Sequence, residues 1–253
     1  MWSIEGKQHK MIFMEYSSIT DIGLFREKNQ DSFLAIENKY GDFLGIVADG
    51  IGGGKAGEVA SSEVIKYFNE VFKESGEFNS VEDMINYLEY HVKCANKAVY
   101  DLAKSNDNYT GMGTTLTGIL ITKLATVSMN CGDSRVYGFL DSKIFRLTED
   151  HTLVNQMLQN GQITYEESLN HPKRHYLVKA IGIFDNIVTD IHKVKDMDYY
   201  LICSDGLHSY VSDEDICKIV NSDKTVEEKV VDLKDIALLK GGYDNITIVL
   251  VKK

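Results

Sequence analysis

Several aspartates of this chain stand where an apolar run ends in a tight polar turn. Four are each followed by Gly, Ser or Asn: Asp49, Asp133, Asp205 and Asp244. Asp31, in the segment FREKNQDSF, is a fifth. Any one of them could cap a turn or a helix, because an Asp side chain bonds nearby backbone amides. Gathered in one place, however, these carboxylates would raise one another's pKa unless a cation neutralised them. Since all-oxygen ligands suit Mg2+ or Mn2+, the joint pattern predicts a divalent metal site.

Hydrophobic periodicity predicts the elements that must position these acids. An apolar run at residues 43–48 is typical of a buried strand, and short β-rich pieces fill the middle of the chain. Further strands are predicted at 199–203 and 246–251. Helices are predicted over residues 57–74, 81–104, 213–220 and 226–239. Because strands and helices do not alternate as βαβ units, the order favours an α+β fold in which helices cover an antiparallel sandwich.

Composition narrows the class of protein. The net charge of −11 argues against nucleic acid as the main partner, and no basic stripe stands out. The four cysteines are scattered without a CxxC spacing and are expected to be reduced thiols. No apolar stretch is long enough for a bilayer, and the N-terminus lacks the pattern of a secretory signal, so no membrane association and a cytoplasmic location are expected. One proline and no linker-like tract indicate a single domain.

Two other kinds of chemistry can be sought in the motifs. The glycines between Gly52 and Gly57 match GxGxxG after a strand, so a dinucleotide-binding oxidoreductase is an alternative. That fold needs further parallel βα units, whereas two helices follow here. No Cys is followed six residues later by Arg, and no GxSxG segment is present. Covalent catalysis by a side chain is therefore disfavoured.

The ordered motifs resemble the metal-dependent protein serine/threonine phosphatases of the PPM (PP2C-like) family, in their compact bacterial form. The matching segments run across nearly the whole chain: TDIGLFREKNQD (20–31), ADGIGGGKAGEVAS (48–61), GMGTTLTG (111–118), NCGDSRVY (130–137), LTEDHT (147–152), KAIG (179–182), ICSDGL (202–207) and GGYDNITIV (241–249). The resemblance implies a four-layer αββα sandwich, two antiparallel sheets flanked by helices. It also implies hydrolysis of phosphoserine and phosphothreonine in proteins by direct attack of a water that bridges two metal ions.

The resemblance also implies a role for each acid at the metal site. Asp49 would bridge two Mn2+ or Mg2+ ions, and the carbonyl of Gly50 would bind one of them. Asp205 and Asp244 would complete the site from the other side. Asp133 would belong to a third, weaker metal position shared with Asp205.

Two further residues acquire roles from the same resemblance. Arg26 would hold the substrate phosphate, because a guanidinium grips two phosphate oxygens at once. For a lone arginine, a surface salt bridge with Glu27 or another neighbour is the common alternative. Asp31 would support the waters bound to the metal ions.

The sequence departs from the family pattern at several positions. Some members have His directly after the bridging Asp-Gly, where this chain has Ile51. Gly54, Gln30 and Lys179 replace, respectively, a frequent His, an acidic residue of animal members and a more usual Arg. None of these is a main ligand, so a competent enzyme is expected. The histidines offer little by themselves: His151 fits a turn, and His171 and His175 fit a polar surface loop.

The resemblance sets expectations for partners and organisation. Phosphoprotein substrates of a cognate serine/threonine kinase are expected, and the protein should be a monomer. Residues 1–253 should form one phosphatase domain, with residues 1–12 as an N-terminal extension or edge strand and residues 152–176 as a flap beside the active site. A second hypothesis is a binding module that keeps the fold and senses phosphoproteins or metal without turnover.

Overall fold

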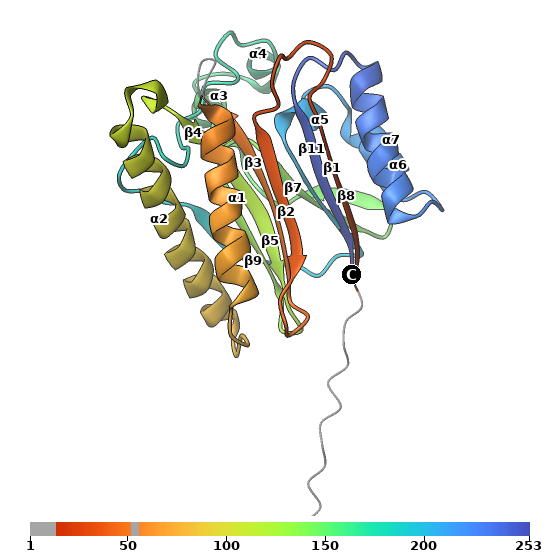
Figure 1. Ribbon diagram of the computed structural model, residues 1–253. Helices are drawn as coiled ribbons and strands as arrows, with labels where there is room; N and C mark the ends of the chain where they lie inside the picture. Colours follow the sequence, from red (N-terminus) through yellow and green to blue (C-terminus); the bar gives the residue numbers. More distant parts are fainter. Residues whose placement is uncertain (1–13, 52–55) are drawn as a thin grey trace, which may run out of the picture.

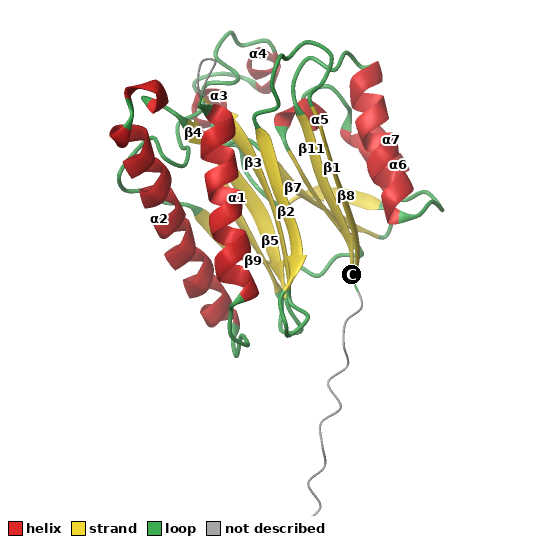
Figure 2. Ribbon diagram, viewed as in Figure 1, coloured by secondary structure: helices red, strands yellow, loops and turns green. Residues whose placement is uncertain are grey.

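Two antiparallel sheets lie face to face between two layers of helices in the computed structural model, which describes residues 14–51 and 56–253 (Figures 1 and 2). The first sheet has the strand order β1-β11-β10-β7-β8. Its strands are β1 (Glu15–Asp21), β11 (Ile246–Lys252), β10 (Tyr199–Cys203), β7 (Arg135–Leu140) and β8 (Lys143–Arg146). The second sheet has the order β2-β3-β5-β6-β9, with β4 paired to β3 beside this path. Its strands are β2 (Asp31–Glu37), β3 (Phe43–Ile51), β5 (Leu116–Ile121), β6 (Thr126–Cys131), β9 (Asp190–Val194) and β4 (Gly113–Thr114).

The inner faces of the sheets pack on each other through large apolar side chains. Phe43 and Val47 of β3 belong to the same buried cluster as Tyr200 and Ile202 of β10 and Val249 of β11. Along β3 the residues from Phe43 to Ala48 are all buried, because one face meets the other sheet and the opposite face meets helices. A strand buried on both faces reads as a continuous apolar run rather than an alternating one.

Helices cover the outer faces of the two sheets (Figure 2). Their apolar sides are buried there. On the second sheet lie α1 (Gly57–Lys73) and α2 (Val81–Ser105), whose buried residues include Phe68 and Leu88. On the first sheet lie α6 (Asp213–Val220) and α7 (Val226–Leu239), with buried residues such as Leu233. Helix α7 begins at a capping box, in which the Thr225 and Glu228 side chains each accept a backbone N–H bond from the other residue.

Shorter helices sit in the connections. They are the 3₁₀ turn η1 (Asp107–Tyr109), α3 (Leu153–Gln159), α4 (Tyr165–Leu169) and α5 (Asp205–His208). Helices α3 and α4 lie at the upper end of the sandwich in Figure 1. Strand β3 ends there, and the connection between β1 and β2 lies there too. The acids predicted to form the site stand at this end. Asp49 lies near the end of β3, Asp31 and Asp205 begin β2 and α5, and Asp133 and Asp244 lie in the connections before β7 and β11.

The fold class predicted from the sequence is confirmed, and so are most element boundaries. The hydrophobic pattern does not predict three of the strands, β1, β2 and β9. All three are edge strands with only partly apolar sequences. The predicted extension at residues 1–12 lies outside the described residues, as does most of the Gly52–Gly57 turn. All strand pairs of the two sheets are antiparallel within the described chain, which contradicts the parallel sheet of a dinucleotide-binding fold.

The structure also describes the state of the cysteines and the character of the helices. The four cysteines are free, and Cys131 and Cys203 are buried. Across residues 14–51 and 56–253, none of the helices combines the length and the apolar character needed to cross a bilayer.

Candidate metal centre

A pocket of about 690 Å³ opens at the end of the sandwich where the acidic connections meet. Six of the seven residues predicted for the site line it: Arg26, Asp49, Gly50, Asp133, Asp205 and Asp244. They come from both sheets. Asp49 and Gly50 belong to β3 of the second sheet, whereas Asp205 follows β10 and Asp244 precedes β11 in the first sheet. Asp133 stands in the turn between β6 and β7, where the chain passes from the second sheet to the first.

Glycines allow the backbone segments under the pocket to approach closely. A Cβ on Gly206 would lie 1.9 Å from the carbonyl oxygen of Asn245, so only glycine lets the start of α5 touch the segment that leads into β11. A Cβ on Gly50 would lie 2.3 Å from the carbonyl oxygen of Gly57. These two contacts hold Asp205 beside Asp244, and the end of β3 against the start of α1.

Crowding of the carboxylates shifts their proton affinities. Burial raises the pKa of Asp49 well above its usual range, and the charges of Asp31, Asp205 and Asp133 raise it further. Burial likewise raises the pKa of Asp133, with Asp205 as the next cause. Without a cation, such carboxylates either take up protons or repel one another. A divalent ion would allow them to remain charged together.

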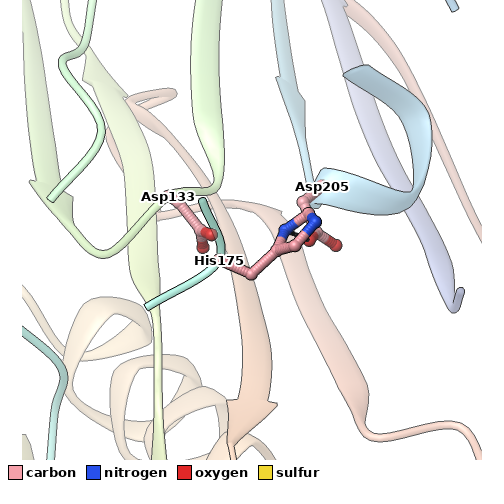
Figure 3. A group of neighbouring side chains, drawn as sticks. All are labelled: Asp133, His175 and Asp205. Carbon is pink, nitrogen blue, oxygen red and sulfur yellow. Dashed lines mark ion pairs between the residues drawn. The ribbon is translucent and has the colours of Figure 1, made fainter. Parts of the chain in front are cut away.

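Asp205 behaves differently, because two histidines and Arg26 lie around it. Burial favours its neutral form, but His175, His208 and Arg26 outweigh burial and lower its pKa. His175 Nδ1 lies 3.6 Å from Asp205 Oδ2. Figure 3 shows that Asp133, His175 and Asp205 reach toward one another from three separate segments, and their potential ligand atoms lie within 4.8 Å of one another.

His175 is the residue of the site that sequence reasoning missed. It was placed on a polar surface loop, and its side chain is indeed 48% exposed. The structure nevertheless brings that loop to the pocket, so that His175 faces the acids and not bulk solvent alone. A signal was present in the sequence, since this histidine falls four residues before Lys179 in the KAIG segment. A spacing along the chain could not show that the loop folds back over Asp205.

Arg26 lines the pocket and forms its ion pair with Asp244. Its Nη2 donates a 2.6 Å hydrogen bond to Asp244 Oδ2, rather than pairing with Glu27. Since half of the Arg26 side chain stays exposed, the rest of the guanidinium faces the open pocket. An anion that enters the pocket can therefore meet both a guanidinium and the ions that the acids attract.

Asp31 lies behind the pocket and does not line it. Directly opposite Asp49 in the β2–β3 register, it accepts a 2.7 Å hydrogen bond from the Ser204 hydroxyl, whereas its Oδ1 is buried without a hydrogen-bond partner. Burial raises the pKa of Asp31 to about 7, and Ser204 and Thr247 only partly oppose this. A buried oxygen that lacks a donor fits the predicted role beside metal-bound water, because water could supply the missing donor.

His151 contradicts the simple turn interpretation. It is buried, its Nδ1 accepts a 3.1 Å bond from the backbone N–H of Gly132, and its Nε2 lies 3.0 Å from Asp190 Oδ2. Because Nδ1 accepts, Nε2 carries the proton and donates to Asp190. Lys179 binds the other oxygen of Asp190 at 3.2 Å. This chain of contacts fixes the turn that carries Asp133.

The residues present fit a divalent metal ion. The donors are carboxylate oxygens and the Gly50 backbone, with His175 as the one nitrogen, a set that suits Mg2+ or Mn2+. The raised pKa values of Asp49 and Asp133 and the unpartnered Oδ1 of Asp31 are each what a bound cation and its waters would relieve.

A pair of antiparallel sheets between helices, with an acidic pocket at one end, is the architecture of the metal-dependent phosphatases that the motifs resemble. The sequence model of the family described as Protein phosphatase 2C matches residues 26–230. A serine/threonine phosphatase, stp, of Listeria welshimeri is 35% identical over 240 residues, which are 92% of this chain and 94% of that protein. Protein phosphatase PhpP of Streptococcus pneumoniae is 34% identical over 240 residues, 94% of this chain and 97% of PhpP.

Solved structures agree with the sequence matches. The crystal structure of serine/threonine phosphatase Stp1 from Staphylococcus aureus has a TM-score of 0.91 to this chain at 34% identity, and the match covers 99% of each chain. The chain belongs to the protein phosphatase 2C family. The family resemblance and the enzyme class predicted from the motifs, a metal-dependent protein phosphatase, are confirmed.

Proposed function

We propose that this chain removes phosphate from phosphoserine and phosphothreonine in proteins, using Mn2+ or Mg2+ held in the acidic pocket. The observation that carries the proposal is the convergence of Asp49, Asp133, Asp205 and Asp244 from both sheets on one pocket that also contains Arg26. Relatives named serine/threonine phosphatases cover nearly the whole chain and support the same substrate class.

The proposed metal ligands are assigned from the places of the acidic residues around the pocket. Asp49 would be shared by two ions, and the Gly50 carbonyl, Asp205 and Asp244 would hold them from either side. Asp133 and Asp205, with His175 close by, form a third position. When bound, the ions supply a water of lowered pKa at the phosphorus and screen the negative charge of the phosphate.

The chain's own residues account for the remaining steps. Arg26 orients the phosphate through its free N–H groups, while its bond to Asp244 keeps the guanidinium at the pocket mouth. Asp31, with one unpartnered oxygen, can accept a hydrogen bond from behind Asp49. Attack of the water oxygen on phosphorus breaks the bond to the Ser or Thr oxygen, which leaves as the alcohol after taking up a proton. Ile51 cannot supply that proton.

Hydrolysis of a phosphothreonine peptide in the presence and absence of Mn2+ tests this proposal. Activity should require Mn2+ or Mg2+, vanish with a chelator and return when the metal is restored. Asp49→Asn should lower kcat by at least about 1,000-fold, because the bridging charge is lost. Asp223→Asn, an exposed change in the α6–α7 connection, is the matched control and should have no effect.

Activity that persists in chelator, or in Asp49→Asn, would reject the proposed chemistry. The non-catalytic alternative makes a different prediction, namely tight Mn2+ binding by calorimetry without turnover of any phosphopeptide. The two ideas therefore separate in a single pair of measurements on the same protein preparation.

The finer expectations belong to this proposal as well. Residues 1–253 act as one domain, and residues 152–176 form a flap whose end carries His175 into the pocket. The protein works as a cytoplasmic monomer that reverses a serine/threonine kinase. Support for a bacterial setting comes from the relatives, which include a serine/threonine phosphatase of Listeria welshimeri. Light scattering checks the monomer, and phosphoprotein profiles of cells lacking the enzyme check the kinase relationship.

A further inference from the structure

Two loops beside the pocket run next to each other in register. The β1–β2 loop contributes Leu24, Phe25 and Arg26, and the α7–β11 loop contributes residues 242–244. The backbone N–H of Leu24 donates a 2.7 Å bond to the carbonyl of Gly242, and Arg26 binds Asp244 at 2.6 Å. Between these two contacts, the rings of Phe25 and Tyr243 stack with centroids 5.1 Å apart and an interplanar angle of 18°.

The stacked rings are held in place yet exposed. Tyr243 lies against Gly241, where a Cβ would come within 2.0 Å of the ring, and its other neighbour is Tyr210 at a centroid distance of 5.3 Å. Even so, Phe25 is 67% exposed and Tyr243 is 51% exposed. Leu24, 65% exposed, continues the apolar surface. A fixed cluster of exposed aromatic side chains of this kind is typical of an interaction site.

The position of these rings indicates what covers them. Phe25 directly precedes Arg26 and Tyr243 directly precedes Asp244. Since Arg26 and Asp244 line the pocket that takes the phosphate, each ring is one residue away from the pocket lining. A substrate protein whose phosphorylated residue enters the pocket must pass its neighbouring residues over the rim. Since an extended chain advances about 3.3–3.6 Å per residue, the positions next to the phosphorylated residue are the ones that can reach the rings.

We infer that Phe25 and Tyr243 form a docking surface for a large apolar side chain that flanks the phosphorylated residue of the substrate. This inference rests on the proposed function and deepens it, because it names a sequence preference of the substrate. The phosphate and the metal ions are common to all substrates, so selectivity among them must come from contacts outside the pocket. Burial of an apolar side chain on two preordered rings is such a contact.

The test uses phosphothreonine peptides of one length and charge, in an Ala/Gly/Ser host, with a single Phe at position −2, −1, +1 or +2. At one or more positions Phe should raise kcat/KM by about 5- to 10-fold over the Ala host. The change should appear in KM, because the flanking contact is the same before and during bond cleavage. Phe25→Ala and Tyr243→Ala should each reduce the ratio of kcat/KM for Phe over Ala toward about 1, whereas Tyr243→Phe should preserve it.

The ratio of kcat/KM for the Phe peptide over the Ala peptide distinguishes a contact between the rings and the substrate from a role of the rings in stabilising the two loops. If the rings only hold the two loops together, both peptides suffer equally in Phe25→Ala and the ratio stays high. Tyr40→Ala, an exposed tyrosine in the β2–β3 turn, is the matched control and should leave the ratio unchanged.

Several results would overturn the inference. A wild-type ratio near 1 at every position would do so while leaving the proposed function intact. Preference for Arg over Phe at the same positions would show that the rings bind a cation instead. If wild type hydrolyses none of the peptides with Mn2+, the proposed function fails and this inference fails with it.

Discussion

Arg26 and Asp244 show how a single ion pair can serve two purposes. Their 2.6 Å contact makes Arg26 a competitor of the metal ion for the Asp244 carboxylate, while its free N–H groups face the pocket. The charges of Asp244, Asp205 and Asp49 all favour the guanidinium at this place. Removal of the arginine should therefore affect metal binding and phosphate binding in opposite directions.

Arg26→Ala should bind Mn2+ about 3- to 10-fold more tightly, because Asp244 loses its competing cation. The same variant should lose at least about 10-fold in kcat/KM on a phosphopeptide, since the phosphate loses a bidentate donor. Calorimetry measures the first effect and steady-state kinetics the second. Lys28→Ala, which removes a cation of the same loop that pairs with Glu58, is the control and should change neither. Weaker Mn2+ binding in Arg26→Ala would contradict the competition.

Asp49 makes a second prediction at this scale, on stability. Burial and the neighbouring acids raise the pKa of Asp49. Ionisation of this side chain is therefore less favourable in the folded than in the unfolded chain, and it destabilises the metal-free protein at neutral pH. Asp49→Asn should therefore raise the melting temperature in chelator by a few degrees, although it abolishes activity. Differential scanning calorimetry checks this, and Mn2+ should stabilise wild type more than the variant. An unchanged melting temperature in chelator would mean that the acids are not crowded in solution.

At the scale of elements, glycines determine how closely the loops under the pocket approach. Gly206→Ala would place a Cβ 1.9 Å from the Asn245 carbonyl, so α5 and the segment before β11 must separate. We expect a loss of about 1–3 kcal/mol in the free energy of unfolding and reduced activity, because Asp205 moves away from Asp244. Chemical denaturation and kinetics check both effects.

Gly76→Ala is the matched control for this change. Nothing lies within 4 Å of a Cβ at Gly76, which follows the end of α1. The variant should be as stable as wild type or up to about 1 kcal/mol more stable, because alanine restricts the unfolded chain. Equal effects of the two substitutions would show that the close approach at Gly206 has no role in the site.

The elements also show what the sequence could and could not predict. Strands such as β3, and long helices such as α1 and α2, were visible because burial on one or both faces leaves a regular apolar pattern. Edge strand β1 is mostly polar or charged, and its pairing with β11 is a long-range contact that local patterns do not encode. The turn motifs that mark the acids are local, so the sequence predicts them. The contacts of His175 with Asp205 and of His151 with Gly132 join distant segments, so local patterns do not predict them.

For the whole molecule, the acidic pocket should make stability depend on pH and on metal together. Burial raises the pKa of Asp31 to about 7, above its value of 3.8 in the unfolded chain. An acid of this kind contributes stability below pH 3.8 that is lost as the pH rises toward 7. In chelator, Asp31→Asn should therefore be more stable than wild type, and this difference in stability should grow from about pH 4 to about pH 7 and then level off.

Melting temperatures of the two proteins between pH 5 and pH 8 check this dependence. Excess Mn2+ should reduce the advantage of Asp31→Asn above pH 7, because the cation compensates the buried charge. Asp223→Asn provides the baseline for loss of an exposed carboxylate. A difference between Asp31→Asn and wild type that does not vary with pH would show that Asp31 titrates normally.

The acids of the pocket belong to two sheets whose inner faces pack on each other through large apolar side chains. The separation of Asp49 from Asp205 and Asp244 is thus governed by the thickness of the layer that contains Phe43, Tyr200 and Val249. Protein interiors transmit changes in side-chain volume as backbone shifts. Substitutions that change the volume of this apolar layer, far from any substrate, should therefore change the distance between the bound ions and with it the rate of the enzyme.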